Sequence, residues 1–191
     1  MRIDYTPAQQ ELRTQLRDYF GSLLTPEAKD AIAREGNGGR TVREIRQKMG
    51  ADGWLGIGWP IEWGGQGRGH IDQWIFFDES MRAGAPVPML TINTVGPTLM
   101  EHGTQEQKER FLPAILRGEI HFCIGYSEAD AGTDLASLST RAVVEGDELV
   151  INGTKLWTSY AQTADWGVAE AEGFIKLFGM SSTLWAEVNR R

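Results

Sequence analysis

The sequence is poor in the residue types from which disulfides, metal sites and nucleic-acid interfaces are built. One cysteine, Cys123, excludes a disulfide within the chain and a multi-cysteine metal site. The three histidines, His70, His102 and His121, share no ligand spacing, so we predict no bound metal. Lysine and arginine total 19 against 26 acidic residues, a net charge of −7. Because phosphate neutralisation needs a basic face, nucleic acid is not expected as a partner.

Long apolar runs are missing as well. None approaches the roughly 20 residues that a membrane-spanning helix needs. The first residues include an acid, Asp4, and lack the apolar core of a signal peptide. The composition, 41% hydrophobic and 24% charged, is that of a soluble globular protein. We therefore expect a cytoplasmic chain without a membrane span.

Residues 1–118 are predicted to form a helical domain. Apolar residues recur at helical spacing, and glycine and proline separate about five such segments. Thr6, Thr41 and Thr104 each precede a Gln or Glu by three positions, the pattern of a capping box. A stretch rich in glycine and tryptophan, 53–69, does not have the GxGxxG spacing of a dinucleotide-binding loop. We predict an ordered loop there, in which the tryptophans pack.

After the helical domain the pattern changes to short β-prone runs. An apolar run over 120–126 is followed by runs over 141–145, 148–151 and 155–158. Gly-Asp and Asn-Gly pairs separate the last three runs and are typical of hairpin turns. We predict a partial β-domain over 119–166.

The last segment, 167–191, differs again. Residues 167–173 fit neither a strand nor a hairpin, whereas large apolar side chains from Phe174 to Val188 recur on one helical face. We predict a helix in this tail. The expected fold class is therefore α+β: an N-terminal helical bundle, a partial antiparallel β-domain and a C-terminal helix.

Three stretches resemble the acyl-CoA dehydrogenase family, in that family's order. They are Pro60-Ile61-Glu62-Trp63-Gly64-Gly65-Gln66-Gly67, Tyr126-Ser127-Glu128-Ala129-Asp130-Ala131-Gly132-Thr133-Asp134 and Val150-Ile151-Asn152-Gly153-Thr154-Lys155-Leu156-Trp157-Thr158-Ser159. We call the last two the second and third motifs. The resemblance covers residues 1–166. It implies a helical domain, a β-domain and a C-terminal four-helix domain, with an FAD that accepts hydride from an acyl-CoA thioester.

The resemblance also implies the residues that contact the flavin. They are Tyr126, Ser127, Gly132, Thr133, Trp157, Thr158 and Ser159. Ser127 and Ser159 would donate hydrogen bonds to the polar edge of the isoalloxazine, and Trp157 would lie against its rings. Gly132 would let backbone amides approach, and Thr133 would face the phosphate or pantetheine side of the ligands. The family often has proline and glycine at the positions of Ala129 and Asp130, so the shape of this loop stays open.

Each assignment has a structural alternative. Ser127 and the neighbouring aspartates can make turns, and Trp157 at a strand end can be part of a core. Glu128 is interpreted as structural, by analogy with the family. Cys123, in an apolar run, is predicted to be a buried, inert thiol.

The sequence departs from the family after Trp166. There the family continues with an apolar strand and, later, with the helical region that carries its catalytic glutamate. No residue of this chain matches that glutamate by motif, so we predict no catalytic base in it and leave open whether the chain is an enzyme alone. An internal deletion or a frameshift that joined distant parts of a longer ancestor is our hypothesis.

Three functions are left open by the sequence. The first is α,β-dehydrogenation of an acyl-CoA thioester, incomplete in a single chain, with an electron-transfer flavoprotein as acceptor by analogy. The second is a non-catalytic subunit or remnant that pairs with a full-length homologue. The third is a flavin monooxygenase or oxidase of the same fold. A homo- or hetero-oligomer with an acyl-CoA dehydrogenase subunit is expected, and the acyl chain, fatty or steroidal, is not determined.

Overall fold

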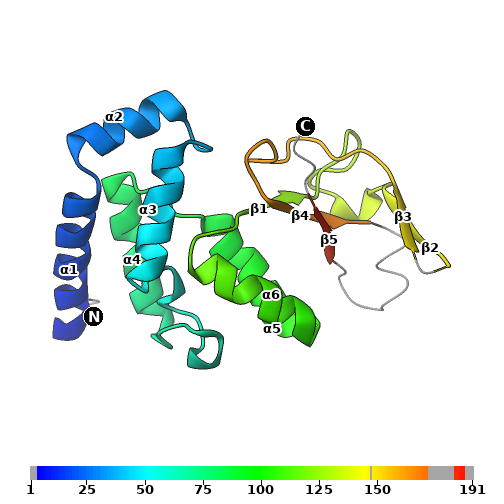
Figure 1. Ribbon diagram of the computed structural model, residues 1–191. Helices are drawn as coiled ribbons and strands as arrows, with labels where there is room; N and C mark the ends of the chain where they lie inside the picture. Colours follow the sequence, from blue (N-terminus) through cyan, green and yellow to red (C-terminus); the bar gives the residue numbers. More distant parts are fainter. Residues whose placement is uncertain (1–3, 147, 172–182, 188–191) are drawn as a thin grey trace. The chain divides into compact units, whose positions relative to one another are not determined.

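The computed structural model describes residues 4–146, 148–171 and 183–187. The chain divides into two compact units, unit 1 over 1–120 and unit 2 over 121–191. Unit 1 is helical, and unit 2 carries two small sheets (Figure 1). A helical region followed by a small sheet confirms the predicted α+β class.

Unit 1 is a bundle of α-helices with a common apolar core, to which every helix except α2 contributes buried residues. The helices are α1 (Pro7–Leu23), α2 (Pro26–Glu35), α3 (Arg40–Ala51), α4 (His70–Ala83), α5 (Gly96–His102) and α6 (Gln105–Leu116). Short turns occur at η1 (Trp54–Gly56), η2 (Ile61–Trp63) and η3 (Thr91–Val95). The largest core side chains are less than 2% exposed and include Leu16, Phe20, Met49, Phe76, Leu99 and Leu112.

Two of the three predicted capping boxes are confirmed. The hydroxyls of Thr6 and Thr104 each accept a bond from the backbone three residues on, and a glutamine side chain there accepts a bond in return. The box at Thr41 is wrong, because α3 begins with Gly39 at its N-cap. Thr41 instead donates its N–H and its hydroxyl to the carboxylate of Glu35, which anchors the end of α2 to the start of α3.

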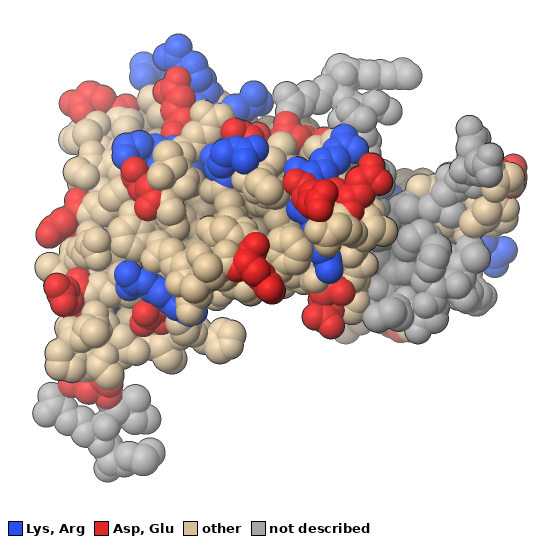
Figure 2. Space-filling model, turned by 60° about the horizontal axis from the view of Figure 1, so that its bottom comes forward, with Lys and Arg blue, Asp and Glu red and all other residues tan. Residues whose placement is uncertain are grey.

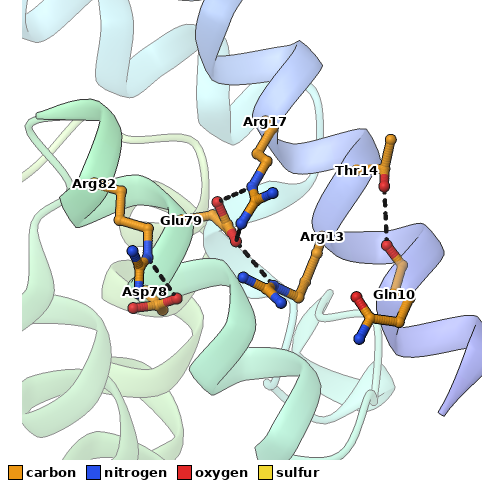
Figure 3. Close-up of polar contacts among 7 residues, drawn as sticks. All are labelled: Gln10, Arg13, Thr14, Arg17, Asp78, Glu79 and Arg82. Carbon is orange, nitrogen blue, oxygen red and sulfur yellow. Dashed lines mark hydrogen bonds and ion pairs between the residues drawn. The ribbon is translucent and has the colours of Figure 1, made fainter. Parts of the chain in front are cut away.

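A buried carboxylate joins α1 to α4. Glu79 on α4 is 3% exposed and accepts hydrogen bonds from Arg13 Nε (2.9 Å) and from Arg17 Nε and Nη2 (2.8 and 3.0 Å) on α1 (Figure 3). Burial alone would raise the pKa of Glu79, but the two arginines outweigh it and hold the pKa below its ordinary value. Beside this cluster, Asp78 and Arg82 form an ion pair within α4 (Figure 3).

Replacing Glu79 with glutamine is expected to lower the free energy of unfolding by about 2–3 kcal/mol. The loss is below that of a fully buried pair because the Arg17 side chain is 56% exposed and can turn to water. Asp78→Asn is the matched control, since its partner Arg82 is largely exposed and the change should cost no more than about 1 kcal/mol. Urea unfolding followed by circular dichroism measures both, and equal losses would contradict the role of burial.

Trp59 fixes the glycine-rich stretch to the core of unit 1. Its ring is 2% exposed, and its Nε1 donates to the carbonyl of Ile92 at 3.1 Å. Gly65 and Gly96 lie against it so closely that a Cβ on either would come within 2.5 Å of a Trp59 carbon. The prediction that the tryptophans of this stretch pack is confirmed for Trp54 and Trp59, both of which are buried.

The charged side chains are mixed in sign on the face shown in Figure 2, where basic and acidic residues lie next to one another. Several ion pairs of unit 1 join residues four positions apart on one helix, such as Lys48 with Asp52 and Arg40 with Glu44. Pairs this exposed contribute little to stability. No helix within the described residues is long and apolar enough to cross a membrane.

Unit 2 contains two sheets. In the first, β1 (Phe122–Gly125), β4 (Trp166–Glu170) and β5 (Thr183–Glu187) lie in the order β1–β4–β5, with β1 and β4 parallel and β4 and β5 antiparallel. In the second, β2 (Arg141–Glu145) and β3 (Glu148–Asn152) form an antiparallel hairpin. The hairpin confirms the predicted strands and turn, but the parallel β1–β4 pair departs from the predicted antiparallel arrangement.

The predicted strand over 155–158 is wrong. This segment is irregular, because the N–H of Leu156 donates to the carbonyl of Ser127 and not to a neighbouring hairpin strand. Residues 167–170 belong to β4, although their own sequence predicts no strand, since β1 supplies their backbone partners. Residues 167–170 thus continue a strand, which removes the reason for placing a junction at residue 167.

The predicted C-terminal helix is also wrong where it can be compared with the structure. Residues 183–187 pair with β4 as β5, so sheet pairing overrides the helical spacing of the apolar residues. The rest of the predicted helix lies outside the described residues.

Candidate functional site

The second and third motifs meet at a buried carboxylate in unit 2. Glu128 follows β1 and is 5% exposed. It accepts hydrogen bonds from the N–H and the hydroxyl of Ser139 (2.6 and 2.8 Å), from the N–H of Thr140 (2.9 Å) and from Lys155 Nζ (2.8 Å). One side chain thus ties together the loop after β1, the segment before β2 and the segment after β3.

The electrostatics of Glu128 are set by these donors. Burial by itself would raise the pKa of the carboxyl group, because it disfavours the charged form. The hydrogen bonds from Lys155, Thr140 and Ser139 act in the opposite direction and outweigh it, so the pKa lies far below its ordinary value. Glu128 is therefore a permanent anion at neutral pH and is unsuited to accept a proton from a substrate.

Two further hydrogen bonds align the motifs along their backbones. Lys155 Nζ also donates to the carbonyl of Tyr126 at 3.0 Å, and Leu156 N donates to the carbonyl of Ser127 at 2.9 Å. The close approach needs a small residue at the end of β1, because a Cβ on Gly125 would lie 3.3 Å from Lys155 Cβ and Cγ. The structure therefore brings the residues around Ser127 next to those around Trp157.

Trp157 is exposed in a backbone conformation that side chains rarely adopt. Its φ of 52° is in the left-handed region, and its ring is 78% exposed. Such a conformation costs about 1–3 kcal/mol and persists only where the surrounding structure fixes it. Core packing against the described residues is thus excluded as the role of Trp157, and its ring offers a large flat surface to a ligand.

The other predicted contact residues of these two segments are exposed to different degrees. Tyr126 and Ser127 are half-buried directly after β1, and Thr158 is half-buried, with its Oγ1 3.6 Å from where a Cβ on Gly125 would lie. Ser159 is exposed at the start of the next turn. These residues, with Trp157, belong to the two segments that the hydrogen bonds hold together.

Gly132 and Thr133 lie apart from these bonds, in an exposed bend before the short η4 turn (Leu135–Ser137). The bend begins where Glu128 N donates to the carbonyl of Ala131 at 2.8 Å. A Cβ on Gly132 would meet no atom within 4 Å, so packing among the described residues does not require glycine there.

The sequence interpretation missed the role of Lys155 and gave Glu128 only a general structural one. The signal in the sequence is weak, because Lys155 is the one basic residue of the two motifs but the second motif offers three acids, Glu128, Asp130 and Asp134. Cys123 is buried, as predicted, and burial raises the pKa of its thiol, which favours the protonated form. No cluster of three potential metal ligands occurs among residues 4–146, 148–171 and 183–187.

Comparison with known proteins gives a consistent result. The acyl-CoA dehydrogenase N-terminal domain matches residues 6–119, and the acyl-CoA dehydrogenase middle domain matches residues 123–181. The acyl-CoA dehydrogenases FadE26 and FadE29 of Mycobacterium tuberculosis are 57% and 49% identical to this chain over 169 and 166 residues. Both alignments cover 87% of this chain, and 42% and 43% of the relatives.

Solved structures agree with the sequence relatives. The ChsE4–ChsE5 complex from Mycobacterium tuberculosis matches with a TM-score of 0.90 and 52% identity, over 99% of this chain and 49% of that chain. The Tcur3481–Tcur3483 steroid ACAD matches with a TM-score of 0.81 and 51% identity, over 90% and 45%. The chain spans somewhat less than half the length of these relatives. The match to both domains, over most of its residues, shows that this chain belongs to the acyl-CoA dehydrogenase family.

Proposed function

We propose that this chain supplies the N-terminal and middle-domain part of an FAD-dependent acyl-CoA dehydrogenase. The reaction is α,β-dehydrogenation of an acyl-CoA thioester, with loss of a proton from the α-carbon and a hydride from the β-carbon. The observation that carries the proposal is the junction of the second and third motifs. There, the N–H of Leu156 donates a hydrogen bond to the carbonyl of Ser127, and the next residue in the sequence is the exposed Trp157.

The residues at this junction fit an isoalloxazine. Ser127, Thr158 and Ser159 bring hydroxyl donors for its polar edge, and Trp157 brings an aromatic surface that would exclude water from one side. Tyr126 would lie at the same edge, and Gly132 and Thr133 toward the phosphate or pantetheine groups, as the family resemblance implies. When bound, FAD supplies the hydride acceptor.

The substrate we propose is a steroidal acyl-CoA thioester. The support is the identity of about half to the chain of a solved structure described as a steroid ACAD. No residue of this sequence matches the family's catalytic glutamate by motif, so the general base would come from another segment or from a partner subunit. An electron-transfer flavoprotein would reoxidise the flavin, by analogy with the family.

We further propose that the chain acts in a hetero-oligomer with another acyl-CoA dehydrogenase subunit. Two similar solved structures, the ChsE4–ChsE5 complex and the Tcur3481–Tcur3483 steroid ACAD, are each named for two components. In this chain the β2–β3 hairpin leaves Val143, Val144 and Ile151 between 42% and 51% exposed. A two-stranded hairpin with apolar exposed side chains is marginal in water and gains from a covering partner. A flavin-binding but non-catalytic subunit is the second candidate on the same observation.

Purification from the native host, followed by anaerobic addition of a steroidal or fatty acyl-CoA, tests the proposal. Flavin absorbance that co-purifies and bleaches with the thioester supports dehydrogenation. Flavin that is retained without bleaching favours the non-catalytic subunit, and oxygen consumption in turnover favours the monooxygenase or oxidase. Absence of flavin from the chain and from any complex that contains it would contradict the proposal.

The contact of Trp157 with the flavin can be tested by substitution. Trp157→Leu is expected to weaken FAD binding roughly threefold to tenfold, the effect of losing one ring–ring contact. Trp74→Leu is the matched control, because Trp74 is 53% exposed but belongs to unit 1. Titration of the apoprotein complex with FAD gives both dissociation constants, and equal values would remove Trp157 from the site.

A further inference from the structure

We propose that Glu128 and Lys155 form a positioning clamp, which holds the second and third motifs in register and so presents Ser127 and Trp157 to the cofactor. The inference rests on the proposed function for the identity of that cofactor. The clamp residues themselves are positioning residues, because they act through the segments that they hold.

Neither clamp residue is accessible for chemistry. The side chains of Lys155 and Glu128 are 13% and 6% exposed. A carboxylate has about four acceptor positions, and Glu128 accepts four hydrogen bonds, from Ser139, Thr140 and Lys155. Lys155 divides its protons between Glu128 and the carbonyl of Tyr126. A filled, buried ion pair fixes geometry and leaves catalysis to the groups around it.

The bonds of the clamp are adjacent in sequence to the proposed contact residues. Lys155 Nζ donates a hydrogen bond to the carbonyl of Tyr126, and the N–H of the next residue, Leu156, donates to the carbonyl of Ser127. Consecutive residues of the third motif thus bond to consecutive carbonyls of the second. The bond from Glu128 N to the carbonyl of Ala131 closes the loop that follows, so Ser127 lies between two fixed points.

The exposed conformation of Trp157 also requires the clamp. A left-handed, exposed tryptophan is retained only if both flanking segments are fixed. On one side Leu156 and Lys155 are bonded to the second motif. On the other side Ala161 N donates to the carbonyl of Thr158 (3.2 Å), and Ala164 N to that of Tyr160 (2.9 Å). With the clamp open, the first anchor weakens and the ring is free to relax toward more ordinary backbone conformations.

Three properties of the Lys155→Met variant test the clamp in the chain with whatever partner co-purifies. Hydrogen exchange of the Leu156 amide is expected to accelerate at least tenfold. Iodide quenching of the Trp157 fluorescence is expected to change. The Trp157 signal is obtained by subtracting the fluorescence of the same protein with Trp157→Phe. The dissociation constant for added FAD is expected to rise about tenfold. Glu128→Gln should behave alike, and Lys155→Arg should recover most of each property because it keeps a cation with several donors.

Lys48→Met is the matched control, because Lys48 also pairs with a carboxylate but on an exposed helix face in unit 1. The clamp would be overturned if the Lys155→Met protein folds and its Leu156 amide exchange, Trp157 quenching and FAD affinity all equal those of the wild type. If Lys155→Met does not fold, Glu128→Asp gives the same comparison. Wild-type protein that binds no FAD would refute the proposed function instead, and the exchange and quenching results would still decide the clamp.

Discussion

Trp59→Ala is expected to lower the free energy of unfolding of unit 1 by about 3–5 kcal/mol, the usual cost of truncating a buried aromatic residue. The loss should fall at the upper part of that range for two reasons. The ring lies against Gly96, and the backbone and Cβ of Trp59 lie against Gly65, so neither glycine has a side chain that could collapse into the cavity. Its Nε1 also satisfies the carbonyl of Ile92, which would be left without that buried partner.

Urea unfolding followed by the helical circular dichroism signal measures this loss, since the α-helices of the described chain belong to unit 1. Trp74→Ala is the control, because Trp74 is half exposed and stacks on Tyr5, with ring centroids 6.2 Å apart. It should cost about 1 kcal/mol or less. Comparable losses for the two variants would show that Trp59 does not hold the glycine-rich stretch to the core.

Acidification is expected to destabilise unit 2 through Glu128. The pKa of this carboxyl group is depressed in the folded chain, so its contribution is complete above the unfolded value of 4.5 and is lost as the pH falls through the folded value. The loss therefore begins near pH 5 and grows toward lower pH. Its limit is about 3–5 kcal/mol, the cost of removing one partner from a buried ion pair that includes Lys155.

The Glu128→Gln variant isolates this contribution. It should be less stable than the wild type at neutral pH, and its stability should fall less steeply between about pH 5 and pH 2. Glu79 in unit 1 also has a depressed pKa, so it too makes the free energy of unfolding fall as the pH decreases. Only the difference between the wild type and Glu128→Gln therefore reports on Glu128. Urea unfolding at several pH values, monitored by tryptophan fluorescence, provides it. Parallel curves for the two proteins would exclude Glu128 as the acid-sensitive group.

Elements with strong local signals were predictable from the sequence. The capping boxes at Thr6 and Thr104 and the hairpin of β2 and β3 depend on residues a few positions apart, whose chemistry selects one backbone conformation. The helix α2 has a similar local signal, because Thr25 caps it and Pro26 occupies its first turn.

Elements that depend on distant partners could not be predicted. Strand β4 contains Gly167 and Ala169, which favour no strand by themselves, and becomes one because β1 pairs with it. Residues 155–158 of the third motif are β-prone, yet the hydrogen bond from Leu156 N to the carbonyl of Ser127 keeps them out of the hairpin, whose last strand ends at Asn152. The predicted contact residues followed only from the family resemblance. The hydrogen bond between Glu128 and Lys155, which brings their segments together, joins positions 27 residues apart and has no local signal in the sequence.

The parallel pairing of β1 with β4 has a consequence for how the chain folds. β1 ends at residue 125 and its partner begins at residue 166, so the sheet cannot close until the intervening loop and hairpin have been synthesised. Contacts of such sequence separation slow folding, because loop closure precedes the stabilisation that it permits. During translation the apolar residues of β1, Phe122 and Cys123 among them, therefore lack their partner strand until some forty further residues have left the ribosome.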